Sequence, residues 1–134
     1  MPTSQSNAAG MKPLSVLIAN AHPAISSTLS LLLGEEPGLR VLGEVSNPKD
    51  LHTQVKILSP DVVLLDWGLT GSRGRELISG LHTDGLQTTV IALSSRPEMR
   101  QAAISSGVDM FVSEGDPPEV LLGAINRLRK QDSK

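Results

Sequence analysis

The sequence contains no cysteine, and only two of its 134 residues, Trp67 and Phe111, are aromatic. The lack of cysteine excludes a disulfide framework, a thiolate nucleophile and a cysteine-ligated metal, and it is typical of a reducing compartment. The scarcity of aromatic side chains means that the core must be built from aliphatic residues. We therefore expect a cytoplasmic protein that forms one domain around an aliphatic core.

Strong charge and long apolar runs are also missing. The formal net charge is -2, which argues against a basic nucleic-acid-binding surface over the whole chain. No apolar run approaches the ~18 to 20 residues needed to cross a bilayer, so no membrane association is expected. Residues 1–13 are polar and lack the apolar segment of a secretory leader, and we expect them to form a flexible tail.

Most of the chain alternates between short apolar segments and segments of helical periodicity. The apolar segments are rich in Val, Ile and Leu, as expected of strands buried on both faces: LSVLIA (14–19), RVLGEV (40–45), DVVLLD (61–66), TTVIAL (88–93) and DMFV (109–112). The last two helices are expected at about 97–106 and 117–130. This βαβαβαβαβα order predicts an α/β fold, with a parallel sheet covered by helices on both faces.

The first expected helix carries Ile25, Leu29 and Leu32 on one face. Gly34 and Gly107 are typical of residues that end helices. The stretch HTDG (82–85) is likewise interpreted as the end of a helix.

Polar residues follow the expected strands where each ends. In an open parallel sheet the functional crevice lies beyond the carboxyl ends of the strands. The residues there are Asn20, Ala21 and His22; Asp66, Trp67 and Gly68; Ser94 and Ser95; Ser113 and Glu114. A carboxylate, two hydroxyls and an amide are expected to converge there. From the pattern alone, Asp66 is equally consistent with a functional acid and with a helix cap, and Trp67 either covers this site or presents an apolar surface to a partner.

Six stretches of the chain resemble the receiver domain of two-component response regulators: IANAHP (18–23), GEVSNPKDL (43–51), PDVVLLDWGLTG (60–71), VIALSS (90–95), GVDMFVSE (107–114) and PPEVLLGAI (117–125). The similarity covers residues 14–131, leaving 132–134 as a tail or the start of a linker. It implies a flavodoxin-like, doubly wound (βα)5 sheet of strand order 2-1-3-4-5, and a signalling module rather than an enzyme. The His22-Pro23 pair is similar to receivers that precede a helix-turn-helix DNA-binding domain.

The resemblance assigns expected roles to four residues. In the family, an aspartate after the third strand accepts a phosphoryl group from a histidine kinase, and Asp66 matches it. Gly68 matches the residue whose backbone carbonyl binds Mg²⁺, and Ser94 matches the hydroxyl donor to the phosphoryl group. Phe111 matches the aromatic residue that changes rotamer on activation.

Two other elements of the family site are replaced. The acidic pair that binds Mg²⁺ becomes Asn20 and Ala21, and the lysine that contacts the phosphoryl group becomes Glu114. Two unit charges about 5 Å apart interact by roughly 3 kcal/mol at an effective dielectric near 20, so exchanging lysine for glutamate costs about twice that in an aspartyl-phosphate state. Even half of this cost lowers phosphorylated occupancy by roughly two powers of ten. We therefore expect no metal cofactor, the alternative being a rearranged cation site of Asp66, Glu114 and Asn20.

These residues favour an atypical receiver, or pseudo-receiver, that binds protein partners. Its expected contact surface, also the expected homodimer surface, is formed by the fourth helix, fifth strand and fifth helix. Transcription control would require a DNA-binding domain or a partner, because this domain has no basic recognition helix. The first alternative is a working receiver phosphorylated at Asp66 by a histidine kinase. A flavin- or nucleotide-binding enzyme is a weak alternative, since no GxGxxG or Walker glycine pattern is present.

Overall fold

The computed structural model describes residues 13–82 and 87–132 of the chain. The expected tails and the HTDG helix end therefore lie wholly or partly outside the described residues. Strands and helices alternate in the order β1 (Leu14–Ala19), α1 (Pro23–Gly34), β2 (Leu39–Val45), α2 (Pro48–Leu58), β3 (Val62–Asp66), α3 (Gly74–Leu81), β4 (Thr89–Ser94), α4 (Arg100–Ser105), β5 (Met110–Ser113) and α5 (Pro118–Asp132). No helix in this described part is long and apolar enough to cross a membrane.

The five strands form one parallel sheet in the order β2-β1-β3-β4-β5. This arrangement confirms the predicted flavodoxin-like fold. Each strand begins and ends within one residue of the expected range. The continuous apolar runs were informative because each strand is covered on both faces, and it therefore needs apolar side chains at successive positions.

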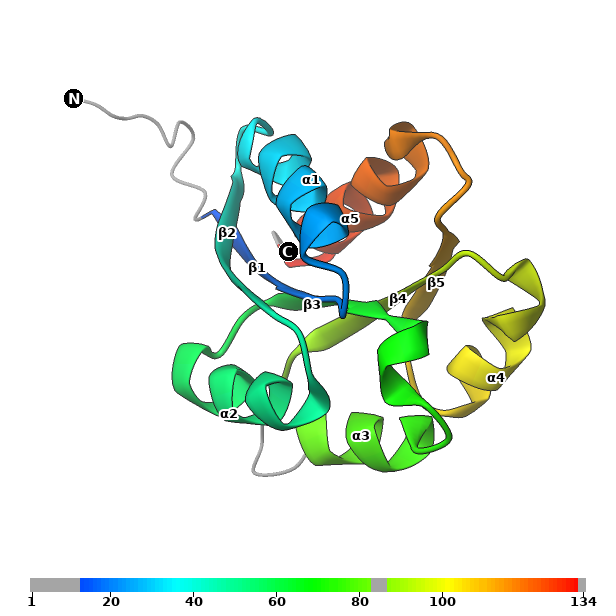
Figure 1. Ribbon diagram of the computed structural model, residues 1–134. Coiled ribbons are helices and arrows are strands. Elements are labelled where there is room, and N and C mark those ends of the chain that lie inside the picture. The colour runs from blue at the N-terminus through cyan, green and yellow to red at the C-terminus, as the bar shows by residue number, and fades with distance from the viewer. Residues whose placement is uncertain (1–12, 83–86, 133–134) are drawn as a thin grey trace.

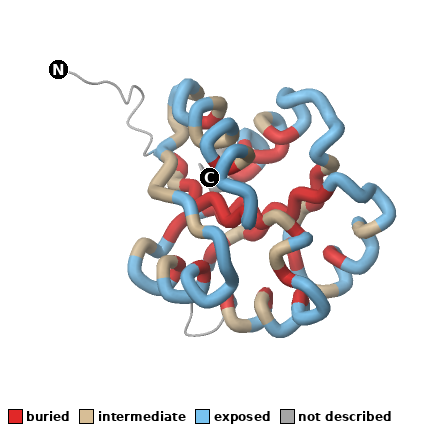
Figure 2. The backbone as a smooth tube through the Cα atoms, viewed as in Figure 1, coloured by how far each residue is buried: buried red, intermediate tan, exposed pale blue. Residues whose placement is uncertain are grey.

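Helices α1 and α5 cover one face of the sheet, and α2, α3 and α4 cover the other (Figure 1). Alternate residues of β1 enter the two cores: Val16 and Ile18 join the cluster under α1 and α5, whereas Leu17 joins the cluster under the other three helices. Figure 2 shows the result, with buried residues along the strands and exposed residues on the outer sides of the helices. The sheet is thus the rigid element from which the loops at its carboxyl edge project.

The structure refines the prediction for the first helix and corrects the one for the fourth. The buried residues of α1 are Ser26 and Leu33, whereas Ile25, Leu29 and Leu32 are only half-buried. They share one face, as predicted, and line a groove between α1 and α5, and Leu29 also packs against the core. The expected fourth helix is divided into a 3₁₀ helix, Pro97–Met99, and α4.

The glycines expected to end helices behave differently from each other. Gly107, just after α4, has a left-handed backbone with φ of 112°, which L side chains rarely adopt. Helix α1 does end at Gly34, but the left-handed residue of that connection is Gly38, with φ of 86°.

Candidate functional site

The residues expected at the site lie at the carboxyl edge of the sheet. Asp66 is the last residue of β3 and pairs in register with Leu93 of β4. Asn20 directly follows β1, and Glu114 directly follows β5. The backbone N–H of Glu114 donates to the carbonyl of Ser94 over 2.8 Å, which ties the ends of β4 and β5 together.

Asp66 is half-buried and begins the turn that follows β3. Its Oδ1 accepts a hydrogen bond from the backbone N–H of Gly68 over 3.1 Å. A Cβ added to Gly68 would lie 3.4 Å from that same oxygen, so a glycine suits this close approach. The local backbone therefore orients the carboxylate that was matched to the phosphoacceptor.

Asn20 is buried, with 1% of its surface exposed. Its Oδ1 accepts the backbone N–H of His22 over 2.9 Å, forming a small turn between β1 and α1. The Nδ2 group is buried and has no hydrogen-bond partner among the described residues. The oxygen of Asn20 thus serves the backbone, and its remaining polar atom is a donor, which cannot ligate a cation.

The family typically binds Mg²⁺, and the residues of this edge do not fit it. Magnesium requires oxygen ligands, usually with one or two carboxylates. The oxygen of Asn20 is already engaged and Ala21 offers no side-chain ligand. Across residues 13–82 and 87–132, no three His, Cys, Asp or Glu side chains are grouped so that they could hold a metal ion. The alternative site of Asp66, Glu114 and Asn20 would have two carboxylates and an amide oxygen that already accepts one hydrogen bond, from the backbone N–H of His22.

Glu114, which the sequence analysis matched to the family's lysine, places an acidic side chain directly after β5. Partial burial, followed by the negative charge of Asp66, raises the pKa of Glu114, whereas the imidazole of His22 acts in the opposite direction. The charge of Asp66 is therefore felt at Glu114, as expected if both carboxyl groups face the same small space. A dianionic phosphoryl group at Asp66 would meet this carboxylate instead of an ammonium group.

Ser94 is buried at the end of β4, with 6% exposed. Its Oγ accepts the backbone N–H of Arg96 over 3.0 Å and so shapes the loop that leads to α4. The hydroxyl proton remains available for donation, because in that bond the oxygen is the acceptor.

Phe111 is buried in β5, with 6% exposed. The guanidinium carbon of Arg100, the first residue of α4, lies 5.0 Å from the centroid of its ring, within the range of a cation–π interaction. The contact connects α4 to the aromatic position on β5. Sequence reasoning missed Arg100, because no helical or strand periodicity relates two residues that lie eleven positions apart in different elements.

Neither interpretation of Trp67 was correct. The side chain is 6% exposed and belongs to the core beneath α2, α3 and α4. A Cβ added to Gly74 would lie 2.6 Å from the indole Cη2, so the glycine at the start of α3 makes room for the ring. Trp67 therefore anchors the loop after Asp66 from below and is not a lid over the site.

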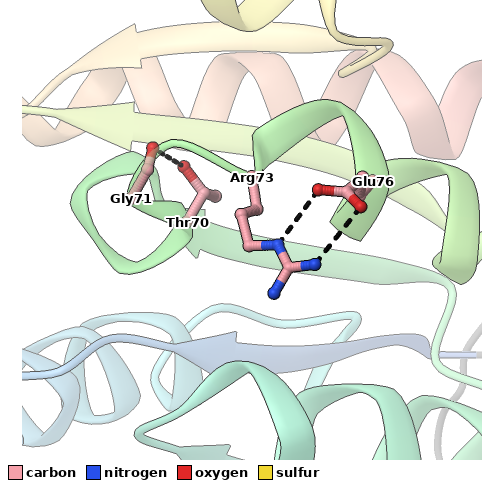
Figure 3. Close-up of polar contacts among 4 residues, drawn as sticks. All are labelled: Thr70, Gly71, Arg73 and Glu76. Atoms are coloured by element: carbon pink, nitrogen blue, oxygen red, sulfur yellow. Dashed lines mark hydrogen bonds and ion pairs between the residues drawn. The ribbon is translucent and has the colours of Figure 1, made fainter.

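The turn between Trp67 and α3 is held by local polar contacts. The hydroxyl of Thr70 donates to the carbonyl of Trp67 over 2.8 Å and lies 3.3 Å from the carbonyl of Gly71. Figure 3 shows this threonine beside the ion pair of Arg73 with Glu76, in which Nε and Oε1 are 3.0 Å apart. The two charged side chains are largely exposed. The ion pair therefore contributes little to stability, and the buried threonine and tryptophan fix the turn.

Comparisons with known proteins agree with the fold. The chain is 28% identical over 118 residues to the nitrate/nitrite response regulator NarL of Escherichia coli, covering 87% of this chain and 55% of that protein. It thus spans about half the length of this relative. The solved receiver domain of NarL from Mycobacterium tuberculosis superposes with a TM-score of 0.79 at 21% identity, covering 89% of this chain and 98% of that one. A DNA-binding response regulator of the LuxR family from Staphylococcus aureus gives a TM-score of 0.76 at 24% identity, with 87% and 98% covered.

The family match extends over nearly the whole described chain. The model of the response regulator receiver domain matches residues 16–126, from β1 into α5. Since this range covers most of β1, the whole of the other four strands and the carboxyl-edge loops, the chain belongs to the response regulator receiver domain family.

Proposed function

We propose that this chain is an atypical receiver, a signalling module of the cytoplasm in which magnesium-dependent phosphorylation of Asp66 is impaired. The observation that carries the proposal is the environment of Asp66. The carboxylate of Glu114 stands where the family has a cation, and the oxygen of Asn20 is bound to the backbone N–H of His22. The acceptor is thus kept while the groups that would neutralise its reaction are lost.

The chemistry explains why these losses act together. An aspartate that attacks a dianionic phosphoryl donor needs cations and hydrogen-bond donors placed before the reaction, so that repulsion is offset as charge accumulates. Ser94 supplies one donor at this edge. With an added carboxylate and no ligand pair for Mg²⁺, we expect phosphorylated occupancy to be lower by roughly two powers of ten than in a receiver with the full set.

The output of such a module would be protein contact. Helices α4 and α5 each expose a large apolar side chain, Ile104 with 45% and Val120 with 42% exposed. These residues support a contact surface formed by α4, β5 and α5, used by an output domain, a regulator or a second copy of the chain. The DNA-binding regulator from Staphylococcus aureus and the NarL relatives support a role in transcription control, with DNA bound by another domain or partner.

The decisive experiment compares the natural chain with a rebuilt one. The rebuilt variant carries Asn20→Asp, Ala21→Asp and Glu114→Lys, and both proteins are treated with acetyl phosphate or phosphoramidate and Mg²⁺ before intact-mass measurement. We expect a single added phosphoryl group on the rebuilt variant and little on the natural chain. Adding Asp66→Asn to the rebuilt variant identifies the modified residue. Efficient, stable phosphorylation of the natural chain at Asp66 would refute the proposal.

A second candidate function keeps the phosphorelay. It is favoured by the retained Asp66, held by Gly68, and by Ser94 at the end of the neighbouring strand. A cognate histidine kinase would then supply the missing positive groups within the complex. Reconstitution with that kinase tests this version, since Asp66→Ala must then abolish both phosphate transfer and the downstream response.

A further inference from the structure

A groove of about 430 Å³ lies between α1 and α5. It reaches the sheet at Leu93 of β4 and Val112 of β5, and it is flanked by Ile25 and Leu29 of α1 and by Leu121 of α5. Leu93 and Val112 are only 3% and 6% exposed, so the groove penetrates to the core. Its volume falls in the range of small-molecule sites, about 300 to 1,000 Å³. A deep apolar space of this size suits a small ligand better than the flat surface of a protein.

The charged side chains of the groove are of one sign. Helix α1, with the sequence PAISSTLSLLLG, has no charged residue from Pro23 to Gly34. Among the described residues that line the groove, the charged ones are Glu114 and Asp116, and both are acidic. The groove therefore combines an aliphatic interior with a negative margin, which complements an apolar molecule carrying a positive group.

Glu114 connects this groove to the carboxyl edge of the sheet. Its side chain lines the groove, and its ionisation responds to the charge of Asp66. Its backbone is fixed by the hydrogen bond to the carbonyl of Ser94. The imidazole of His22 also acts on this carboxyl group. A cation bound at this margin would contact the carboxylate of Glu114. It would also be attracted by the negative charge of Asp66, which acts on Glu114.

We propose that the groove binds a small amphiphilic amine, whose apolar body lies against Leu29 and Leu93 and whose ammonium group pairs with Glu114. The ammonium group of the ligand would bring a positive charge to the carboxyl edge of the sheet, where Asp66 and Glu114 are both acidic. The proposal does not depend on whether Asp66 is phosphorylated.

Three probes with the same ring and different head groups test the proposal: phenethylamine, 2-phenylethanol and 3-phenylpropionate. Binding to the 134-residue chain is followed by chemical-shift perturbation at neutral pH. We expect a dissociation constant on the order of 1 mM for the amine, typical of a ligand of this size. The alcohol should bind about tenfold more weakly because it lacks a charge-assisted hydrogen bond, and the carboxylate more weakly still.

Two variants and one control locate the site. Glu114→Gln should reduce the affinity for the amine about tenfold, to that for the alcohol. Ala24→Phe places a ring at an exposed position that lines the groove and should block the amine and the alcohol. Ser27→Phe, at an exposed position of the same helix away from the groove, should leave binding unchanged. Circular dichroism and thermal unfolding verify that each variant folds.

Several results would overturn the proposal. Equal affinity for the three probes, or an unchanged affinity for the amine in Glu114→Gln, would remove the role of the ammonium group. Absence of binding up to the solubility limit would remove the site itself. Self-association that Ala24→Phe abolishes, without binding of any probe, would assign the groove to a second copy of the chain.

Discussion

Glu114 and Asp66 stand on either side of the end of β4, and partial burial, followed by the negative charge of Asp66, raises the pKa of Glu114. A carboxyl group whose pKa is raised in the folded state binds its proton more tightly there than in the unfolded chain. The folded state is therefore favoured while Glu114 is protonated, and this contribution is lost as the pH rises from near the ordinary value of 4.5 through the raised pKa.

The first prediction concerns this pH dependence. Glu114→Gln removes the ionisation, so the variant should gain thermal stability relative to the natural chain as the pH is raised from about 4 to about 7. Thermal unfolding at several pH values measures the difference, and Glu36→Gln controls for the loss of one charge elsewhere. A difference that stays constant with pH would contradict the prediction.

The second prediction concerns the space beneath Trp67. Gly74→Ala would place a Cβ 2.6 Å from the indole Cη2 and 2.7 Å from Cζ2, and it should lower the free energy of unfolding by about 1 to 3 kcal/mol. Gly80→Ala is the matched control in the same helix, where a Cβ meets nothing within 4 Å and should add up to about 1 kcal/mol. Urea unfolding followed by fluorescence measures both, because Trp67 is the single tryptophan of the chain. Equal effects of the two changes would exclude a tight contact.

The third prediction concerns a buried hydroxyl group. Ser26 is 1% exposed, and its Oγ has no hydrogen-bond partner among the described residues. Ser26→Ala should therefore raise the free energy of unfolding by about 1 kcal/mol, since an unsatisfied buried polar group is removed. Ser27→Ala, at an exposed neighbouring position, changes only helix propensity and should contribute about 0.5 kcal/mol or less. A loss of stability in Ser26→Ala would reveal a partner for the hydroxyl group.

The fourth prediction concerns the opposite edge of the sheet. Asp61 Oδ2 accepts both the backbone N–H of Ser15 over 2.8 Å and its hydroxyl over 3.0 Å, and the backbone N–H of Asp61 donates to Ser15 Oγ over 2.9 Å. Asp61→Ala should cost about 1 kcal/mol, because charge-assisted hydrogen bonds are lost at a solvated position. A double-mutant cycle with Ser15→Ala measures the coupling by chemical denaturation. Additive effects would show that the two side chains act independently.

The fold was predictable because the apolar sequence of each strand matches its burial in the folded protein, where both faces of the sheet are covered by helices. Runs such as VVLL in β3 are apolar at every position because α1 and α5 cover one side chain and α2, α3 and α4 the next. The orientation of α1 was not predictable. Its apolar residues form two overlapping stripes, of which Leu33 is buried in the core with residues of β1, whereas Leu29 lines the groove between α1 and α5.

The candidate site was predictable in place but not in its contacts. Strand ends located Asn20, Asp66, Ser94 and Glu114 at one edge, since parallel strands end together. The side-chain oxygen of Asn20 accepts the backbone N–H of His22. This contact depends on the conformation of the loop, which the sequence pattern does not predict. The burial of Trp67 depends on the approach of Gly74, which sequence periodicity does not encode.

The hydrogen bonds that join strand beginnings lie far from the residues matched to the signalling site. Asp61 binds Ser15 at one such junction, and Asp109 Oδ2 accepts the backbone N–H of Val90 over 2.8 Å at another. Asn20 and Glu114 lie at the opposite edge and take no part in these hydrogen bonds. A change of side chain at the carboxyl edge therefore does not remove the hydrogen bonds that hold the strand beginnings together.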